Sequence, residues 1–268
     1  MHRLASHTRG PDTVRGGCDA RGVVDFAHED LTGSTFEDVD LTGARFRNVL
    51  LRGAEIRGAW AERLVVDGGF EELVLNGIDV VPLWRAELAR RHPEYPMLTP
   101  DDAEGYRAVW PLLEEQWAGT VDRARALPEE LLHERVDGEW SFVETLRHLL
   151  FVHDAWLRRA VLGETDYDPL DLPHDEMPDL EGVPHDADAR PALDHVLALR
   201  EDRLAVARRF FDGLTDELLG SEVAVTGPGY PEAGSYRVPR CLHAVLDEEW
   251  WHRRFAERDL AVLEARVS

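Results

Sequence analysis

The sequence of 268 residues contains no lysine, so all 30 of its basic side chains are arginines. This bias is typical of a GC-rich genome, in which arginine codons displace lysine codons. The 53 acidic residues outnumber the arginines and give a formal net charge of −23. A charge of this sign opposes attraction to nucleic acid or to an anionic membrane surface. We therefore expect neither as a partner.

Cysteine is nearly absent as well, since only Cys18 and Cys241 occur, and two cysteines make no disulfide framework. No apolar run has the length needed to span a bilayer. The first residues lack the apolar stretch of a secretory signal. These absences favour a soluble cytoplasmic protein. Residues 1–20 are polar and without periodicity, which predicts a disordered tail.

A repeat of five residues begins at Val24. Phenylalanine, leucine or isoleucine occupies every fifth position of the repeat: Phe26, Leu31, Phe36, Leu41, Phe46, Leu51 and Ile56. A period of five fits neither a helix nor a strand and indicates a repeat solenoid. These residues resemble the pentapeptide-repeat family. The resemblance implies a short right-handed β-helix over residues 21–82, with the central Leu or Phe side chains stacked inside.

The remainder of the chain has helical patterns. Residues 83–100 predict a short helix, which we expect to cap the open end of the solenoid, followed by a linker. Over residues 101–268 we predict four long amphipathic helices, at about 102–126, 142–162, 191–212 and 238–264, and hence a four-helix bundle. The capping signals are Asp101 or Asp102 for the first helix and the Ser141–Glu144 capping box for the second. The predicted fold class is therefore multidomain, β plus all-α.

A long segment, residues 164–190, connects the second and third predicted helices. It is rich in proline and acidic residues and has no periodicity. Connections of this length in compact domains are usually lids or disordered segments.

Two polar residues of the last helix point to chemistry. Glu248 and His252 are four residues apart and therefore share one helix face, which is predicted to face inward. A carboxylate and an imidazole in a core need a partner, because an unpaired buried charge costs several kcal/mol. The partner could be a divalent metal ion, or an arginine such as Arg253 in a salt bridge. On the second helix, His148 lies among leucines, as a core histidine or a ligand would.

The segments WSFVETLRHL (140–149) and LDEEWWHRRFAERDL (246–260) resemble the DinB-like four-helix bundles. This metal-binding superfamily includes mycothiol-dependent maleylpyruvate isomerase and thiol S-transferases. The resemblance implies that His148, Glu248 and His252 ligate one metal ion. Glu-x-x-x-His is the pattern of the mycothiol-dependent branch.

One carboxylate and two imidazoles suit Zn²⁺, or another divalent metal, and leave a fourth position vacant, as in catalytic zinc sites. The leading hypothesis is a metal-dependent thiol S-transferase or thiol-dependent isomerase that activates a low-molecular-weight thiol for attack on a small electrophile. The resemblance and an actinobacterial-like composition imply mycothiol as that thiol. We name no catalytic residue other than the three predicted metal ligands.

Other residues are secondary candidates. Trp140, Arg253 and His174 are predicted to bind substrate, although core packing, surface pairing and a solvated loop position explain them as well. Glu249 is the alternative carboxylate. Cys241 near the ligand face is more typical of a small core residue than of a nucleophile.

Two competing hypotheses remain open. The bundle could bind a metal structurally, without turnover. Alternatively, the protein could be a non-catalytic interaction protein that presents the repeat as a docking surface. Mimicry of DNA is a special case of the latter, since residues 21–80 contain 12 acidic residues and 6 arginines. A monomer or a homodimer is expected.

Overall fold

The computed structural model describes residues 17–18, 24–26, 29–47, 49–175 and 177–267. The predicted tail, residues 1–20, lies outside the described residues except for positions 17 and 18. The chain divides into two compact units, Met1–Arg57 and Gly58–Ser268, with the division inside the repeat. In the first unit, strand β1 (Gly17–Cys18) pairs antiparallel with β2 (Val24–Asp25).

The backbone of residues 29–57 repeats with the period of the sequence. A positive φ angle recurs at multiples of five residues, with values of 76° at Gly33, 53° at Asp38, 76° at Gly43 and 67° at Gly53. Every second corner is a turn closed by a backbone hydrogen bond, as in the 3.0 Å contact from the Ser34 N–H to the Leu31 carbonyl. Glycine fits these corners because it adopts a positive φ without strain, and aspartate, as at Asp38, also tolerates this region.

The side chains of the first unit do not form the predicted packed interior. Phe36, Phe46 and Ile56 are 56%, 63% and 79% exposed, although each occupies a central position of the repeat. Residues 29–47 and 49–57 contain no β-strand. The five-residue repeat is therefore present in the backbone, whereas a stacked β-helix remains a prediction.

The second unit begins with the end of the repeat region and a short hairpin of β3 (Val74–Leu75) and β4 (Ile78–Asp79). Helix α1 (Val81–Arg91) follows, with a proline in its first turn, and then the 3₁₀ turn η1 (Tyr95–Leu98). Trp84 of α1 stacks on Trp251 of the last helix at 6.2 Å between ring centroids, and Leu88 joins the core of the bundle. The helix predicted to cap the solenoid therefore packs against the bundle.

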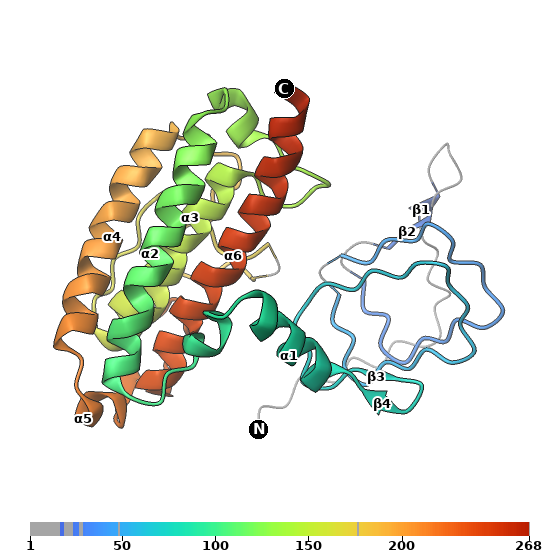
Figure 1. Ribbon diagram of the computed structural model, residues 1–268, viewed down its shortest axis with the longest axis horizontal. Coiled ribbons are helices and arrows are strands. Elements are labelled where there is room, and N and C mark those ends of the chain that lie inside the picture. Colours follow the sequence, from blue (N-terminus) through green and yellow to red (C-terminus); the bar gives the residue numbers. More distant parts are fainter. Residues whose placement is uncertain (1–16, 19–23, 27–28, 48, 176, 268) are drawn as a thin grey trace. The chain divides into compact units, whose positions relative to one another are not determined.

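Four long helices form the bundle: α2 (Ala103–Arg125), α3 (Phe142–Val152) with its continuation η3 (His153–Val161), α4 (Leu193–Gly213) and α6 (Val238–Val267). Figure 1 shows α2, α3, α4 and α6 running side by side. The predicted caps are confirmed, because Asp102 accepts the Gly105 N–H and Ser141 and Glu144 form the capping box. The sequence pattern predicts one regular helix over 142–162, but the second half, η3, is a π-helix.

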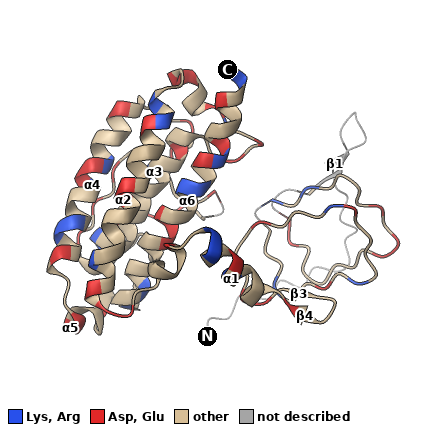
Figure 2. Ribbon diagram, viewed as in Figure 1, with Lys and Arg blue, Asp and Glu red and all other residues tan. Residues whose placement is uncertain are grey.

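Shorter elements connect the helices. They are the 3₁₀ turn η2 (Glu129–His133), the single turn α5 (Asp216–Leu219), and the hairpin of β5 (Glu222–Val225) and β6 (Gly234–Arg237) that leads directly into α6. The core is apolar and closely packed around fully buried side chains such as Leu146, Leu150 and Trp250. Figure 2 shows acidic and basic residues interspersed along the outer faces of the bundle helices. Within the described part of the chain, no helix is long and apolar enough to cross a membrane.

The 164–190 segment is anchored to the bundle rather than free. Asp171 and Leu172 are almost fully buried. Arg147 of α3, which has no exposed surface, donates hydrogen bonds to the carbonyls of Leu170, Asp186 and Ala189. Hence this segment is held at both ends of its course over α3, and it carries His174 toward the interior of the bundle.

Candidate metal centre

Four polar side chains from three parts of the bundle meet beside α3 and α6. His148 comes from α3, His174 from the 164–190 segment, and Glu248 and His252 from α6. The ring centroid of His148 is 4.4 Å from that of His174 and 4.7 Å from that of His252. The carboxylate oxygen Oε2 of Glu248 lies 3.6 Å from Nε2 of His148 and 2.9 Å from Nε2 of His252. The helical spacing of Glu248 and His252 brings both to the same face, as predicted.

The donor atoms are close enough to share one metal ion. One ligand atom each from His148, His174 and Glu248 lie within 4.8 Å of one another. Around a tetrahedral Zn²⁺ with bonds of about 2 Å, neighbouring ligand atoms are separated by about 3.3 Å. The 3.6 Å between His148 and Glu248 is near this value. His252 is instead at hydrogen-bonding distance from the same carboxylate oxygen.

His148 is oriented for ligation by its second ring nitrogen. Its Nδ1 lies 2.8 Å from the carbonyl oxygen of Leu172. Because a carbonyl only accepts, Nδ1 carries the hydrogen, and Nε2 of the neutral ring presents a lone pair. That Nε2 is buried and has no hydrogen-bond partner among the described residues. A buried acceptor without a partner is unfavourable unless something binds there, and this is the observation that best fits a metal ion.

The electrostatics favour the ligand forms of both groups. Burial lowers the pKa of His148, which favours the neutral ring that binds metals, and the nearby Glu248 only partly offsets this effect. Burial alone would raise the pKa of Glu248, but the neighbouring imidazoles of His148 and His252 outweigh burial and lower the pKa below its ordinary value. Glu248 therefore supplies a negative charge to the site near neutral pH.

Trp140, a predicted substrate-binding residue, forms one wall of the cluster. Its ring centroid lies 4.6 Å from that of His148, and its ring stacks on His252 at 5.7 Å and on His174 at 6.1 Å. His174, the second predicted substrate-binding residue, belongs to the group of donors itself. Periodicity could not find this donor, because its position depends on the path of a segment without regular structure.

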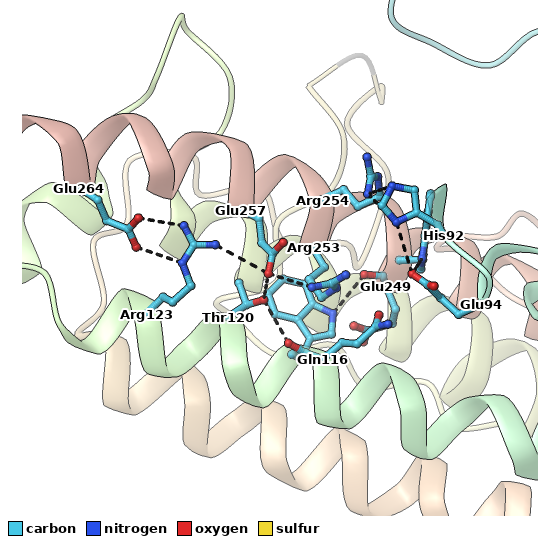
Figure 3. Close-up of polar contacts among 12 residues, drawn as sticks. His92, Glu94, Gln116, Thr120, Arg123, Glu249, Arg253, Arg254, Glu257 and Glu264 are labelled. Carbon is cyan, nitrogen blue, oxygen red and sulfur yellow. Dashed lines mark hydrogen bonds and ion pairs between the residues drawn. The ribbon is translucent and has the colours of Figure 1, made fainter. Parts of the chain in front are cut away.

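Arg253 and Glu249 do not join the cluster. Arg253 is nearly buried and its NH1 donates to Glu257 at 2.9 Å, on the face of α6 that meets α2 (Figure 3). Glu249, the alternative carboxylate, is fully buried between Arg200 and His153. Each lies one residue after a site residue, and one residue rotates a side chain about 100° around the helix axis.

Cys241 lies within the core and offers no accessible nucleophile. Its side chain is buried, and burial raises the pKa of the thiol to about 11. A thiol of this kind is inert near neutral pH. This placement agrees with the prediction of a small core residue.

Two family models match the chain. The model of the DinB superfamily matches residues 112–256, which is more than half of the sequence and includes His148, His174, Glu248 and His252. The model of pentapeptide repeats matches eight copies within residues 25–63. Neither a curated protein nor a solved structure matches the chain.

Proposed function

Because the chain belongs to the DinB superfamily, we propose that its bundle is a metal-dependent enzyme of the thiol S-transferase kind. His148, Glu248 and His252 are the proposed ligands of a divalent ion, with Zn²⁺ as the best chemical fit to two imidazoles and one carboxylate. The activated thiol is a low-molecular-weight compound such as mycothiol, and the second substrate is a small electrophile. The buried and unpartnered Nε2 of His148 supports this proposal most directly.

The protein's own residues prepare the site. A bound Zn²⁺ supplies a Lewis acid that lowers the pKa of a thiol. The carbonyl of Leu172 keeps the proton of His148 on Nδ1, so that Nε2 is free to ligate. Glu248 adds one negative charge, and the ring of Trp140 shields the imidazoles on one side from water. Cys241 cannot supply this thiol, since its side chain is buried and its pKa is raised.

His174 distinguishes this proposal from its main alternative. In a catalytic site the fourth position belongs to water or substrate, whereas four protein ligands make a structural site. The nearness of His174 to His148 and Glu248 favours the alternative of a closed structural site. Under the catalytic proposal His174 is dispensable for metal retention, because the other three residues hold the ion.

Metal content tests the proposal directly. Protein purified without a histidine tag is expected to contain about one divalent ion per chain. His148→Ala should lose the ion, whereas the matched control His195→Ala, an exposed position of α4, should keep it. Wild-type protein that contains no divalent ion and takes up none on reconstitution would refute the metal site.

Enzymatic and structural roles then separate in the His174→Ala variant. The catalytic proposal predicts that this variant keeps its metal and its fold, and that the wild type consumes mycothiol in the presence of an alkylating probe such as monobromobimane faster than the uncatalysed reaction. Loss of the metal together with the fold in His174→Ala would instead establish the closed structural site. Circular dichroism and metal analysis on the same samples distinguish the two results.

For residues 21–82 we propose a right-handed β-helix that serves as a docking surface for a protein partner. The eight matched repeats support the coil, and exposed apolar side chains outside the central positions, such as Leu50 and Trp60, support a surface to be covered. In a β-helix, Leu41→Arg places a charge in the coil interior and should abolish amide hydrogen-exchange protection in the repeat, whereas Glu37→Arg should not. Equal protection in both variants would contradict the coil.

A further inference from the structure

His174 lies on the side of the candidate metal centre from which a small molecule can enter. A pocket of about 280 Å³ adjoins the centre, and His174 and Glu248 are among the residues that line it, whereas His148 and His252 are not. His148 is fully buried, and His252 is largely buried. A molecule that approaches through the pocket therefore meets His174 and Glu248 before the other two donors.

The spacing of the donor atoms includes His174 among the candidate ligands. One ligand atom each of His148, His174 and Glu248 lie within 4.8 Å of one another, and His252 is not part of this group. The Nε2 of His252 is instead 2.9 Å from the Glu248 carboxylate, a hydrogen-bonding distance. The distances thus favour His174 as a ligand at least as strongly as they favour His252.

The residues on both sides of His174 are tied to the centre. The carbonyl of Leu172 lies 2.8 Å from Nδ1 of His148. The carboxylate of Asp175 accepts the Nε1–H of Trp140 at 3.4 Å, and the Trp140 ring stacks on His174 itself. These contacts hold the imidazole of His174 beside the other donors.

His174 is also the donor that can leave without a movement of the bundle. The described residues of the 164–190 segment contain no helix or strand, whereas the other three donors project from α3 and α6. The hydrogen bond between Asp175 and Trp140 is exposed and long. Arg147 anchors the segment before and after His174, so the part between can open while its ends stay attached. Regions held by few, exposed hydrogen bonds open at low free-energy cost.

We propose that His174 is the fourth ligand of the metal ion in the substrate-free protein and that an incoming thiol takes its place. The exchange of ligands rests on the proposed function, whereas ligation by His174 does not. The thiol binds as an anion and releases its proton to solvent, and the imidazole leaves uncharged. Four protein ligands are typical of a structural site, but a ligand on a segment that can open leaves the ion accessible to substrate.

Full-length protein loaded with Co²⁺ tests the ligation, because the visible absorption of this ion depends on its ligands and geometry. His174→Ala should change the spectrum, whereas His185→Ala, an exposed histidine of the same segment, should not. His174→Ala should also lower the affinity for Zn²⁺ by about tenfold or more, because even a hydrogen-bond partner of a ligand is worth about 10–100-fold. The ion remains bound, since three ligands remain. An unchanged spectrum and affinity in correctly folded His174→Ala would overturn the proposal.

Cleavage after Glu181, an exposed residue of the segment, measures the opening. Bound Zn²⁺ should slow cleavage by a glutamate-specific protease in the wild type and in His185→Ala, relative to the metal-free form of each protein, but not in His174→Ala. The monothiol 2-mercaptoethanol should return the wild type to its metal-free rate. This arm needs no variant, so it stays decisive if His174→Ala folds poorly. Slow cleavage that persists while charge-transfer absorption shows the thiol on Co²⁺ would overturn the exchange.

These outcomes are separable from those of the proposed function. A spectrum that depends on His174, together with cleavage restored by the thiol, would support the inference even if the protein consumed no mycothiol. Conversely, a metal-loaded and active protein whose spectrum and cleavage do not depend on His174 would refute only the fourth ligand.

Discussion

Arg147 is a buried cation whose hydrogen-bond partners are backbone carbonyls. It has no exposed surface, and its N–H groups reach the carbonyls of Leu170, Asp186 and Ala189. These contacts fix the 164–190 segment, which in turn presents the Leu172 carbonyl to His148. The planar fork of a guanidinium can satisfy three acceptors that lie apart, and an ammonium group cannot reproduce this geometry.

We predict that both Arg147→Lys and Arg147→Ala destabilise the protein by about 3 kcal/mol or more, because buried carbonyls lose their donors. Proteolysis within residues 164–190 should also become faster. Urea denaturation and limited digestion with a glutamate-specific protease measure the two effects, because Glu164 and Glu181 lie in the segment. Exposed Arg209→Ala is the control. A change of less than about 1 kcal/mol in Arg147→Ala would show that water replaces the guanidinium.

Asp171 is a buried acid beside a second acid. Its side chain has no exposed surface. Burial raises its pKa to about 9, and the negative charge of Asp154 contributes to the rise. Asp154 itself is paired with Arg158 and Arg203 at 2.9 and 2.7 Å. Near neutral pH, Asp171 is therefore protonated in the folded protein and ionised in the unfolded chain.

This difference determines how Asp171 affects stability. Between its ordinary pKa of 3.8 and about 9, the folded state binds one proton more than the unfolded state. The contribution of Asp171 to the free energy of unfolding therefore falls as pH rises through this interval, by up to about 1.4 kcal/mol per pH unit. Asp171→Asn, which keeps the shape without the titration, should be more stable than the wild type at pH 8, with a gap that narrows toward pH 5. Thermal denaturation across this range would contradict the assignment if the two curves stayed parallel.

At the scale of elements, one buried carboxylate connects three helices. Glu249 of α6 contacts His153 of η3 at 2.7 Å and forms an ion pair with Arg200 of α4. Burial alone would raise the pKa of Glu249, but the charge of Arg200 and the contact with His153 lower it to about 2. The π-helix η3 begins at His153 itself, so the change of helix type occurs where this contact is made.

We predict that Glu249→Ala destabilises the bundle by about 3–5 kcal/mol, because Arg200 would remain buried without a counter-charge. Glu217→Ala, at an exposed position of α5, is the matched control and should change stability by less than about 0.5 kcal/mol. Urea denaturation followed by circular dichroism measures both. If Glu249→Ala were as stable as the control, the three-helix connection would contribute nothing to folding.

The sequence predicts those elements that are determined by contacts between residues close together in the chain. Asp102 and the pair Ser141–Glu144 mark helix starts through contacts within one turn, so the starts of α2 and α3 were predictable. The spacing of Glu248 and His252 likewise defines a shared face. The π-helix and the position of His174 depend on contacts between distant segments, such as Leu172 with His148. No periodicity along the chain encodes such contacts.

The same reasoning explains why the turns of the repeat could be predicted from the sequence, whereas the packing of its side chains could not. The five-residue period predicts the corners at Gly33, Gly43 and Gly53, because each corner is a property of four successive residues. Stacking of Phe36, Phe46 and Ile56 requires successive coils to pack, and this is not observed among residues 29–57. Whether Glu248 or Glu249 faces the candidate metal centre also depends on the register of α6. The structure places Glu249 in an ion pair with Arg200 instead.

Across the bundle, charged side chains on the outer faces link neighbouring helices. Arginines join neighbouring helices, as between Arg123 and Glu264 at 2.9 Å and between Arg208 and Glu114 at 2.7 Å. These pairs are partly exposed and contribute little to stability individually. The remaining acidic excess repels anions at long range.

Among the described residues, every buried apolar side chain lies at Val81 or later. The first turn of α1 needs only the two residues before it, since the carboxylate of Asp79 accepts the Val81 N–H at 3.1 Å. We therefore predict that a fragment of residues 79–268 folds with the helicity of the corresponding part of the full chain and binds the same amount of metal. Its melting temperature should lie within about 4 °C of that of the full-length bundle, because the apolar core, the main source of stability, is retained. A fragment that aggregates, or melts far lower, would show that residues before Asp79 stabilise the bundle through contacts in solution, and would make the repeat part of one cooperative unit.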